Sequence, residues 1–363
     1  MRTASPVNNP CALGALLASI HPVDTRHIAE ARRRIDSLTK PVGSLGRLEA
    51  IAAQMFSIFG GEVPMPLKRA VYVFAADHGV AAEGVSAYPP EVTAQMVRNF
   101  LDGGAAINVL ARLHHAALSI VDVGVMAEFG DAAGLYRMKI RPGTRNMRRE
   151  PAMTEEEMMR AIGVGISIAN TAAENGESIV AAGEMGIGNT TSASAITSLL
   201  TGQPVAAVTG RGSGLDAEAR NRKLNVIRRS IKLHFRPDSN PHALEILRCV
   251  GGLEIAAMAG FMLGAAANRI SVVCDGFIST AAAAVACALC GHMRDYLFAG
   301  HCSEEPGNRF LLRKLGLSPV LNLGMRLGEG TGAVLAMPII ESSVRLMTEM
   351  ATFSSAGVSG AAR

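Results

Sequence analysis

Short β-rich segments alternate with helical segments through the middle of the chain, and this alternation limits the possible folds more than any other feature. The β-rich segments are mostly Val, Ile or Ala, and each ends in Gly, Asp or a polar turn, as buried strands do. They are Ala70–Phe74, Leu118–Val123, Ser178–Ala182, Ala206–Thr209 and Ile270–Cys274. The pattern predicts an α/β fold, with a mostly parallel sheet and helices on both faces. Ligands of such sheets bind beyond the carboxyl ends of the strands.

Capping residues and apolar periodicity predict the helices. Asp24 or Thr25 can cap the first helix, Pro90 precedes another, and Thr154 with three following glutamates begins a third. The expected helices cover 24–35, 48–59, 90–100 and 154–175. From about Pro319 the chain is expected to be helical again.

Composition excludes several classes of function. The 363 residues carry a net charge of +4, and the basic residues stand in short groups typical of solvated helix faces. Aromatic residues make up 4% and Trp is absent, which argues against a nucleic-acid surface built on base stacking. Cys287 and Cys290 form a single CxxC without the second ligand pair that zinc normally requires. We therefore expect six small, buried and reduced thiols in the cytosol.

Two apolar stretches test for a membrane span. Ile255–Asn268 is too short to cross a bilayer, and Gly276–Met293 is borderline in length and mostly Ala. Both are expected to be buried helices. The first residues lack the pattern of a secretory signal, so a cytoplasmic protein is expected.

Glycine-rich loops follow two of the expected strands. Gly183–Thr191 (GEMGIGNTT) leads into a helix, where backbone N–H groups and the helix N-terminus favour an anion. It matches neither the Walker A pattern nor GxGxxG, which disfavours dinucleotide binding. A second loop, Gly210–Gly214, also precedes a helix, and Lys223 lies about two turns into that helix. Two such loops indicate two sides of one phosphorylated ligand, although a plain turn and a surface lysine are the alternatives.

Three acidic residues stand at the ends of other segments. Asp77, beside His78, can bind a ligand or stabilise its own turn. Asp275 can accept hydrogen bonds from ribose hydroxyls or cap the Ala-rich helix that follows it. Glu329 stands between two glycines, which permit close ligand approach. A carboxylate beside apolar walls can have a raised pKa and act as a general base, although a surface turn would also explain this residue.

These segments resemble the nicotinate-nucleotide–dimethylbenzimidazole phosphoribosyltransferase family. The resemblance runs in order from about residue 20 to about residue 350. The matching segments are Lys40–Glu49 (KPVGSLGRLE), Ala76–Val80 (ADHGV), Gly183–Thr191, Val273–Phe277 (VCDGF) and Met325–Gly332 (MRLGEGTG).

The resemblance implies an architecture and a reaction. A large Rossmann-like domain would cover residues 65–324, and a small helical domain would combine residues 1–64 and 325–363 from both chain ends. Nicotinate mononucleotide and 5,6-dimethylbenzimidazole would give α-ribazole 5′-phosphate and nicotinate, in the nucleotide-loop branch of cobalamin biosynthesis. The resemblance also implies a homodimer that needs neither a metal nor a cofactor.

The family motifs also imply the roles of single residues. Glu329 would be the catalytic base, with Leu327 and Gly328 in its loop. The ligand loop would include Glu184, Met185, Gly186, Asn189 and Thr190. Gly212 and Lys223 would hold the nucleotide phosphate, and Asp275 and Ser303 would lie near the ribose and nicotinate. Tyr88 and Met96 would contact the benzimidazole; some relatives carry Ser and Gln there, so the accepted base could differ.

Two other functions fit parts of the sequence. A nicotinamide-dependent dehydrogenase would use the same kind of sheet, but the missing GxGxxG weighs against it. A regulatory protein that binds nicotinate mononucleotide without releasing nicotinate is the second alternative. Glu329 between its two glycines favours chemistry over sensing.

Overall fold

The computed structural model describes residues 10–212, 214–237 and 239–359. A single sheet of seven parallel strands, in the order β3-β2-β1-β4-β5-β6-β7, forms its centre. The strands are β1 Arg69–Ala76, β2 Ala117–Gly124, β3 Leu135–Arg137, β4 Ile179–Met185, β5 Ser271–Cys274, β6 Leu297–His301 and β7 Pro319–Leu321. The order reverses between β1 and β4, which is the topological switch point where ligands of such sheets bind. The α/β prediction is confirmed.

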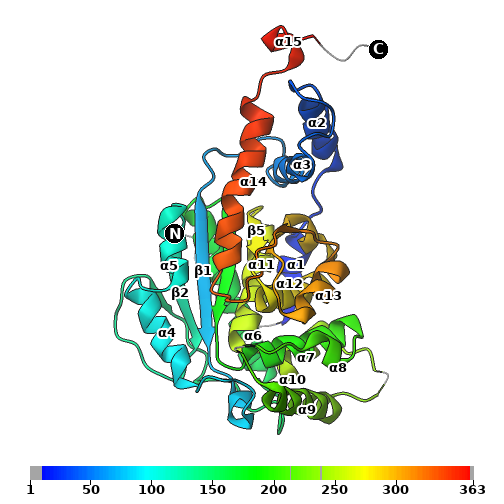
Figure 1. Ribbon diagram of the computed structural model, residues 1–363. Coiled ribbons are helices and arrows are strands. Elements are labelled where there is room, and N and C mark those ends of the chain that lie inside the picture. Colours follow the sequence, from blue (N-terminus) through cyan, green and yellow to red (C-terminus); the bar gives the residue numbers. More distant parts are fainter. Residues whose placement is uncertain (1–9, 213, 238, 360–363) are drawn as a thin grey trace.

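Helices cover both faces of the sheet (Figure 1). The helices up to β4 are α1 Pro10–Ser19, α2 Thr25–Asp36, α3 Arg47–Ile58, η1 Gly79–Glu83, α4 Glu91–Leu101, α5 Ala106–Leu113 and α6 Glu155–Glu174. Those that follow are α7 Asn189–Thr201, α8 Val205–Val208, α9 Ala217–His234, α10 Ala243–Val250, α11 Leu253–Ala267, α12 Phe277–Leu289, η2 Gly291–Tyr296, α13 Pro306–Leu315, α14 Thr331–Glu349 and α15 Phe353–Ala356. Adjacent residues of β1 show the layering. Tyr72 packs on Phe261 of α11, and the side chain of Val71 faces Gly330 at the start of α14.

The expected helix starts are confirmed at their caps. The Asp24 side chain accepts from the N–H of Arg26 at the start of α2. Thr154 and Glu157 form a reciprocal capping box at the start of α6. The two apolar stretches form α11 and α12, whose residues are almost all buried against the sheet and one another. Within the described residues, no helix combines the length and the apolar character that crossing a bilayer requires.

Two segments differ from their predictions. Ala206–Thr209 is not a strand, because residues 205–208 form the short helix α8. Pro204 precedes this helix with φ −56°, a value suited to a helix start, and a four-residue run of Ala and Val cannot distinguish strand from helix by pattern alone. The stretch after Pro319 begins with β7, which pairs with β6 before α14 starts. Cys11 is exposed, whereas four of the other five cysteines are buried.

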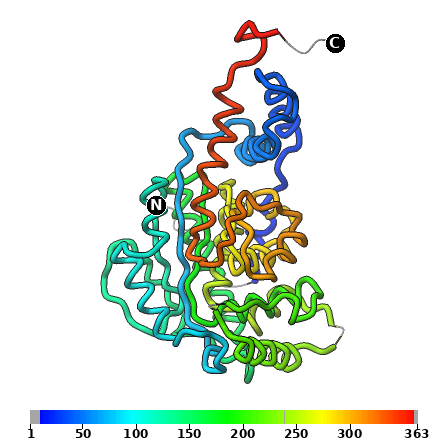
Figure 2. Tube along the Cα trace, viewed as in Figure 1, coloured from blue at the N-terminus to red at the C-terminus, as the bar shows by residue number. Residues whose placement is uncertain are grey.

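Segments from both chain ends pack together at one end of the molecule. Figure 2 shows α2 and α3, in blue, beside the last turns of α14, in red. Their apolar side chains form a separate small cluster of Ala31, Ile35, Ala52, Ala53 and Met347. Helix α1 instead packs on α11 of the main body, and the first half of α14 packs on the sheet. The division at residues 64 and 325 therefore stays a prediction; residues 1–9 and 360–363 lie outside the described part.

Candidate functional site

A cavity of about 460 Å³ opens beyond the carboxyl ends of β4, β5 and β6. Its walls come from the loops after these strands, from α4 and the segment before it, and from the loop before α14. Most of the predicted site residues line it: Tyr88, Met96, Glu184, Met185, Gly186, Asn189, Thr190, Gly212, Ser303, Leu327, Gly328 and Glu329. Lys223 and Asp275 are not on its wall, but each hydrogen-bonds to residues that are on it or next to it.

Glu329 occupies the loop that leads into α14, and its backbone is unusual. Its φ is +63°, in the left-handed region that residues other than Gly seldom adopt, between Gly328 at +88° and Gly330 at +91°. The side chain is 6% exposed, and Oε2 accepts a hydrogen bond of 3.3 Å from the backbone N–H of Ile107. Burial raises the pKa of this carboxyl, and the nearby Asp275 raises it further, while the Ile107 N–H lowers it. A carboxylate of this kind can act as a general base near neutral pH.

Asp275 anchors the Glu329 loop. Its carboxylate is 1% exposed and accepts backbone hydrogen bonds from Gly330 at 3.1 Å, Gly332 at 2.7 Å and Ala333 at 3.0 Å. Asp275 therefore caps the N-terminus of α14, and not the Ala-rich helix α12 that follows it in sequence. Both oxygens already accept backbone hydrogen bonds. Asp275 therefore affects the cavity by holding the loop that carries Glu329. The predicted ribose contact stays a prediction.

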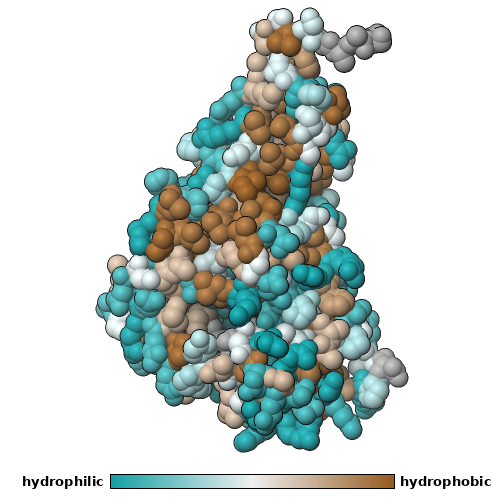
Figure 3. Space-filling model, in the orientation of Figure 1, coloured by the Kyte–Doolittle hydropathy of each residue, from teal (hydrophilic) through white to brown (hydrophobic). Residues whose placement is uncertain are grey.

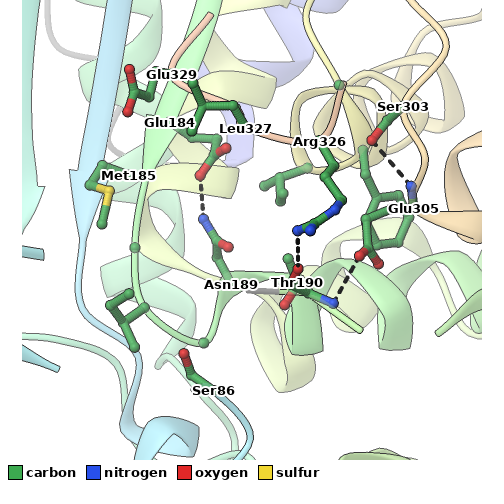
Figure 4. Close-up of a pocket in the computed structure, with 18 of the residues that line it drawn as sticks. Ser86, Glu184, Met185, Asn189, Thr190, Ser303, Glu305, Arg326, Leu327 and Glu329 are labelled. Atoms are coloured by element: carbon green, nitrogen blue, oxygen red, sulfur yellow. Dashed lines mark hydrogen bonds between the residues drawn. The ribbon is translucent and has the colours of Figure 1, made fainter. Parts of the chain in front are cut away.

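Glu184 lies beside Glu329 (Figure 4), near the end of β4. The Asn189 side chain donates a hydrogen bond to its carboxyl. Burial raises the pKa of Glu184 to about 8, and the negative charges of Asp275, Glu254 and Glu329 add to the effect. Glu184 is therefore protonated at neutral pH, which leaves Glu329 as the stronger candidate base of the two.

The opposite end of the cavity suits an anion. Figure 4 shows Thr190, Arg326 and Glu305 together there, away from Glu329. Lys223 of α9 is completely buried and donates to Thr190 Oγ1 at 2.7 Å. Arg326 Nη1 donates to the carbonyl oxygen of Gly212 at 3.3 Å. The second glycine-rich loop thus follows a helix and not a strand, yet it reaches the same cavity as the first.

The remaining walls are less polar. Tyr88 is 54% exposed and Leu327 56% exposed, so both stand at the mouth, whereas Met96 and Met185 are partly buried. Ser303 lies after β6, and its Oγ accepts the backbone N–H of Glu305 at 3.3 Å. A flat apolar ring fits this side of the cavity better than a charged group does.

Sequence reasoning assigned no role to Arg326, Glu305 or His301, which also line the cavity. Arg326 and Glu305 lie in or next to recognisable motifs, but only the fold brings their side chains within hydrogen-bond distance of Gly212. Asp77 and His78 lie behind the first glycine loop and not on the wall. His78 Nε2 pairs with Glu254 Oε1 at 2.7 Å, and both side chains are fully buried. Among the described residues, no group of three or more His, Cys, Asp or Glu could hold a metal ion.

A cavity with a buried carboxylate at one end and an anion site at the other fits an enzyme that transfers a phosphorylated group. Residues 20–358 match a family model described as a phosphoribosyltransferase. The nicotinate-nucleotide–dimethylbenzimidazole phosphoribosyltransferase of Geobacter sulfurreducens is 54% identical over 342 residues, which are 94% of this chain and 97% of that protein. The enzyme of the same name from Roseiflexus is 51% identical over 96% of this chain and 98% of that protein.

Solved structures agree with the sequence comparison. The crystal structure of CobT from Thermus thermophilus superposes with a TM-score of 0.89 at 47% identity, over 93% of this chain and all (100%) of that one. The chain belongs to the nicotinate-nucleotide–dimethylbenzimidazole phosphoribosyltransferase family. The family prediction is confirmed, and the dehydrogenase alternative has no support from these relatives.

Proposed function

We propose that the chain transfers the phosphoribosyl group of nicotinate mononucleotide to a nitrogen of 5,6-dimethylbenzimidazole. The products are α-ribazole 5′-phosphate and nicotinate, in the nucleotide-loop assembly branch of cobalamin biosynthesis. The observation that carries the proposal is Glu329, a buried carboxylate of raised pKa on the wall of a cavity whose far end suits a phosphate. The names of the relatives support the same pair of substrates.

The reaction needs one proton acceptor. The nicotinate ring of the nucleotide carries a positive nitrogen, so the C1′–N bond breaks with its electrons going to that nitrogen, and no acid is required. The lone-pair nitrogen of the benzimidazole forms the new bond to C1′ from the α face, which inverts the β linkage. Its other nitrogen then loses a proton to Glu329. General base catalysis of this kind contributes about 10²–10⁴-fold, and alignment of the two substrates supplies the rest.

The phosphate and the base occupy opposite ends of the cavity in this scheme. Lys223, Thr190 and the backbone of Gly186 hold the phosphate, and the Gly212 turn, whose N–H and C=O are bound by Glu305 and Arg326, forms the wall beside it. Asp275 and Ser303 lie near the ribose and nicotinate. The benzimidazole lies against Tyr88, Met96 and Met185. Because Glu184 is neutral below its pKa of about 8, it adds no second negative charge beside Glu329 at neutral pH. Adenine, other benzimidazoles and phenolic compounds are the alternative acceptors.

The direct test is to incubate purified protein with nicotinate mononucleotide and 5,6-dimethylbenzimidazole and to follow both products by chromatography. We expect nicotinate and α-ribazole phosphate in equal amounts, and almost none with Glu329→Gln. Release of nicotinate only with another acceptor would change the base and keep the reaction. Tight nucleotide binding without nicotinate release, with any acceptor, would instead identify a sensor of the nucleotide.

We also propose that the chain is a cytosolic homodimer. Figure 3 shows hydrophobic side chains gathered over α5 and α14. The exposed large apolar side chains include Val109 and Leu113 on α5, and Leu323 and Leu327 before α14. Such a surface supports self-association. Light scattering coupled to size-exclusion chromatography should give twice the chain mass, and Leu113→Glu should lower it; a monomer at micromolar concentration would contradict the dimer.

A further inference from the structure

Lys223 is the buried cation at the end of the cavity that suits an anion. Its side chain on α9 is completely buried below the Gly212 loop, and its Nζ donates to Thr190 Oγ1 at 2.7 Å. Within the described residues, no carboxylate lies at salt-bridge distance from this amine. A buried ammonium group without compensation tends to release its proton, and a neutral amine binds phosphate poorly.

Glu305 is the carboxylate whose negative charge acts on this amine. It stands at the N-cap of α13 and is 5% exposed. Its Oε1 accepts the backbone N–H of Gly212 at 2.8 Å, and its buried Oε2 has no hydrogen-bond partner among the described residues. The backbone N–H of Glu305 itself is held by Ser303 Oγ at 3.3 Å. The carboxylate is therefore fixed against the turn that approaches Lys223.

The Gly212 peptide lies between these two groups. A Cβ atom placed on Gly212 would lie 3.0 Å from Lys223 Nζ and 3.0 Å from Thr190 Oγ1, which shows how closely the amine approaches the turn. Glu305 holds the N–H of this residue, and Arg326 holds its C=O at 3.3 Å. The turn is thus fixed from two sides, with one negative group and two positive groups around it.

We propose that Glu305 is a positioning residue for the nucleotide phosphate, which fixes the Gly212 turn and keeps Lys223 protonated until the phosphate arrives. This inference rests on the proposed function, because it assumes that the phosphate of the nucleotide occupies this end of the cavity. The carboxylate acts through Lys223 and Gly212 and needs no contact with the substrate.

The electrostatics agree with the geometry. Burial lowers the pKa of Lys223 to about 8; the Glu305 charge acts against this, and Arg220 on the same helix adds to it. Arg326 binds the carbonyl oxygen of the same turn. Without the Glu305 charge, burial and the positive charge of Arg220 would both act to lower the pKa of the amine. Its pKa would fall further, and the lysine would lose its proton at a lower pH.

The test measures nucleotide binding without an acceptor base, so it does not depend on turnover. Calorimetry on the full chain gives the Kd of nicotinate mononucleotide from about pH 6 to about pH 9. Binding should weaken as the pH rises through the Lys223 pKa. Glu305→Gln keeps an oxygen that can accept the hydrogen bond from Gly212. In this variant the alkaline limb, which is the pH range where binding weakens, should begin about one pH unit lower, so that the Kd within the wild-type range becomes about tenfold higher.

Two controls separate charge from structure. Nicotinate riboside lacks the phosphate, and its Kd should show no shift of the limb in Glu305→Gln. Glu305→Asp keeps the charge with a shorter reach, and it should keep the wild-type limb even if its affinity falls at every pH. This variant also decides the matter if Glu305→Gln does not fold, because a limb that moves in Glu305→Asp would refute the role of the charge.

Other outcomes overturn the proposal. An unmoved limb in folded Glu305→Gln means that Glu305 does not control the charge of Lys223. Tighter nucleotide binding at every pH means that the carboxylate competes with the phosphate and does not prepare its site. The wild-type chain could bind nicotinate mononucleotide with the expected weakening at alkaline pH and yet release no nicotinate with any acceptor. In that case the proposed function fails while this inference stands.

Discussion

Asp275→Asn distinguishes two roles for a residue that sequence reasoning placed near the ribose. In the structure its two oxygens accept three backbone hydrogen bonds from Gly330, Gly332 and Ala333. Asn offers only one acceptor oxygen, and its NH₂ group would face a backbone N–H. The variant therefore loses at least one hydrogen bond to a charged acceptor, which is worth about 1.5–3 kcal/mol.

This loss acts on the loop that carries Glu329. If the full cost appears as misplacement of the base, kcat should fall by roughly 10- to 100-fold, because each 1.4 kcal/mol is a factor of about ten. The KM for nicotinate mononucleotide should change little. The negative charge of Asp275 also raises the pKa of Glu329, so its removal should lower that pKa and move the acidic limb of kcat to lower pH. A ribose contact would instead raise the nucleotide KM.

Asp122→Asn is the matched control. Asp122 is 3% exposed at the end of β2 and accepts a backbone hydrogen bond of 2.8 Å from Val125, but it lies off the cavity wall. We expect a similar loss of thermal stability and a normal kcat. Steady-state release of nicotinate at several pH values measures kcat, KM and the acidic limb. A normal kcat in folded Asp275→Asn, or an equal fall of kcat in the control, would refute the anchoring role.

Four further predictions concern the cavity. Glu329→Gln should bind nicotinate mononucleotide normally and lose about 10²–10⁴-fold in kcat; near-normal turnover would exclude Glu329 as the base. Lys223→Ala should mainly raise the nucleotide KM, and an unchanged KM would return Lys223 to a purely structural role. Glu184→Gln should remove a loss of kcat above about pH 8, measured at saturating nucleotide so that the titration of Lys223 does not contribute, because the wild-type carboxyl ionises there beside Glu329; a kcat–pH profile identical to that of wild type would contradict this. Met96→Gln should change the ratio of kcat/KM values for 5,6-dimethylbenzimidazole and adenine by about tenfold, since it places an amide against the base; an unchanged ratio would remove Met96 from base selection.

Local sequence signals predicted the parts of the site that depend on neighbours along the chain. Caps and periodicity located α2 and α6, and the Gly183–Thr191 loop was expected at the end of a strand, where β4 places it. The strand prediction for Ala206–Thr209 was wrong because a segment of a few small residues is too short for its hydrophobic period to distinguish strand from helix. The structure nevertheless places the Gly210–Gly212 turn at the cavity, since α8 and α13 pack against one another and position it.

Long-range pairings could not be predicted from the sequence. The hydrogen bond from Gly212 to Glu305 joins residues 93 positions apart, and that from Gly330 to Asp275 spans 55 positions. Each carboxylate binds an N–H group that is far away along the chain, so local reasoning assigned Asp275 to its own turn or to a ligand and gave Glu305 no role. The neighbouring strands β5 and β6 place Asp275 and Glu305 at one edge of the sheet, where the turn after α8 and the start of α14 pack against them.

The backbone at Glu329 explains why this loop needs so many supports. A residue other than Gly in the left-handed region costs about 1–3 kcal/mol, and such strain persists only where surrounding contacts fix it. Here Asp275 supplies those contacts at the start of α14, and the N–H of Ile107 holds the carboxylate itself. Gly183 completes the fit, because a Cβ at that position would lie 2.4 Å from the carbonyl oxygen of Glu329. The base is therefore held in place before any substrate binds, so a variant that loosens the loop should lower kcat without weakening the binding of the nucleotide.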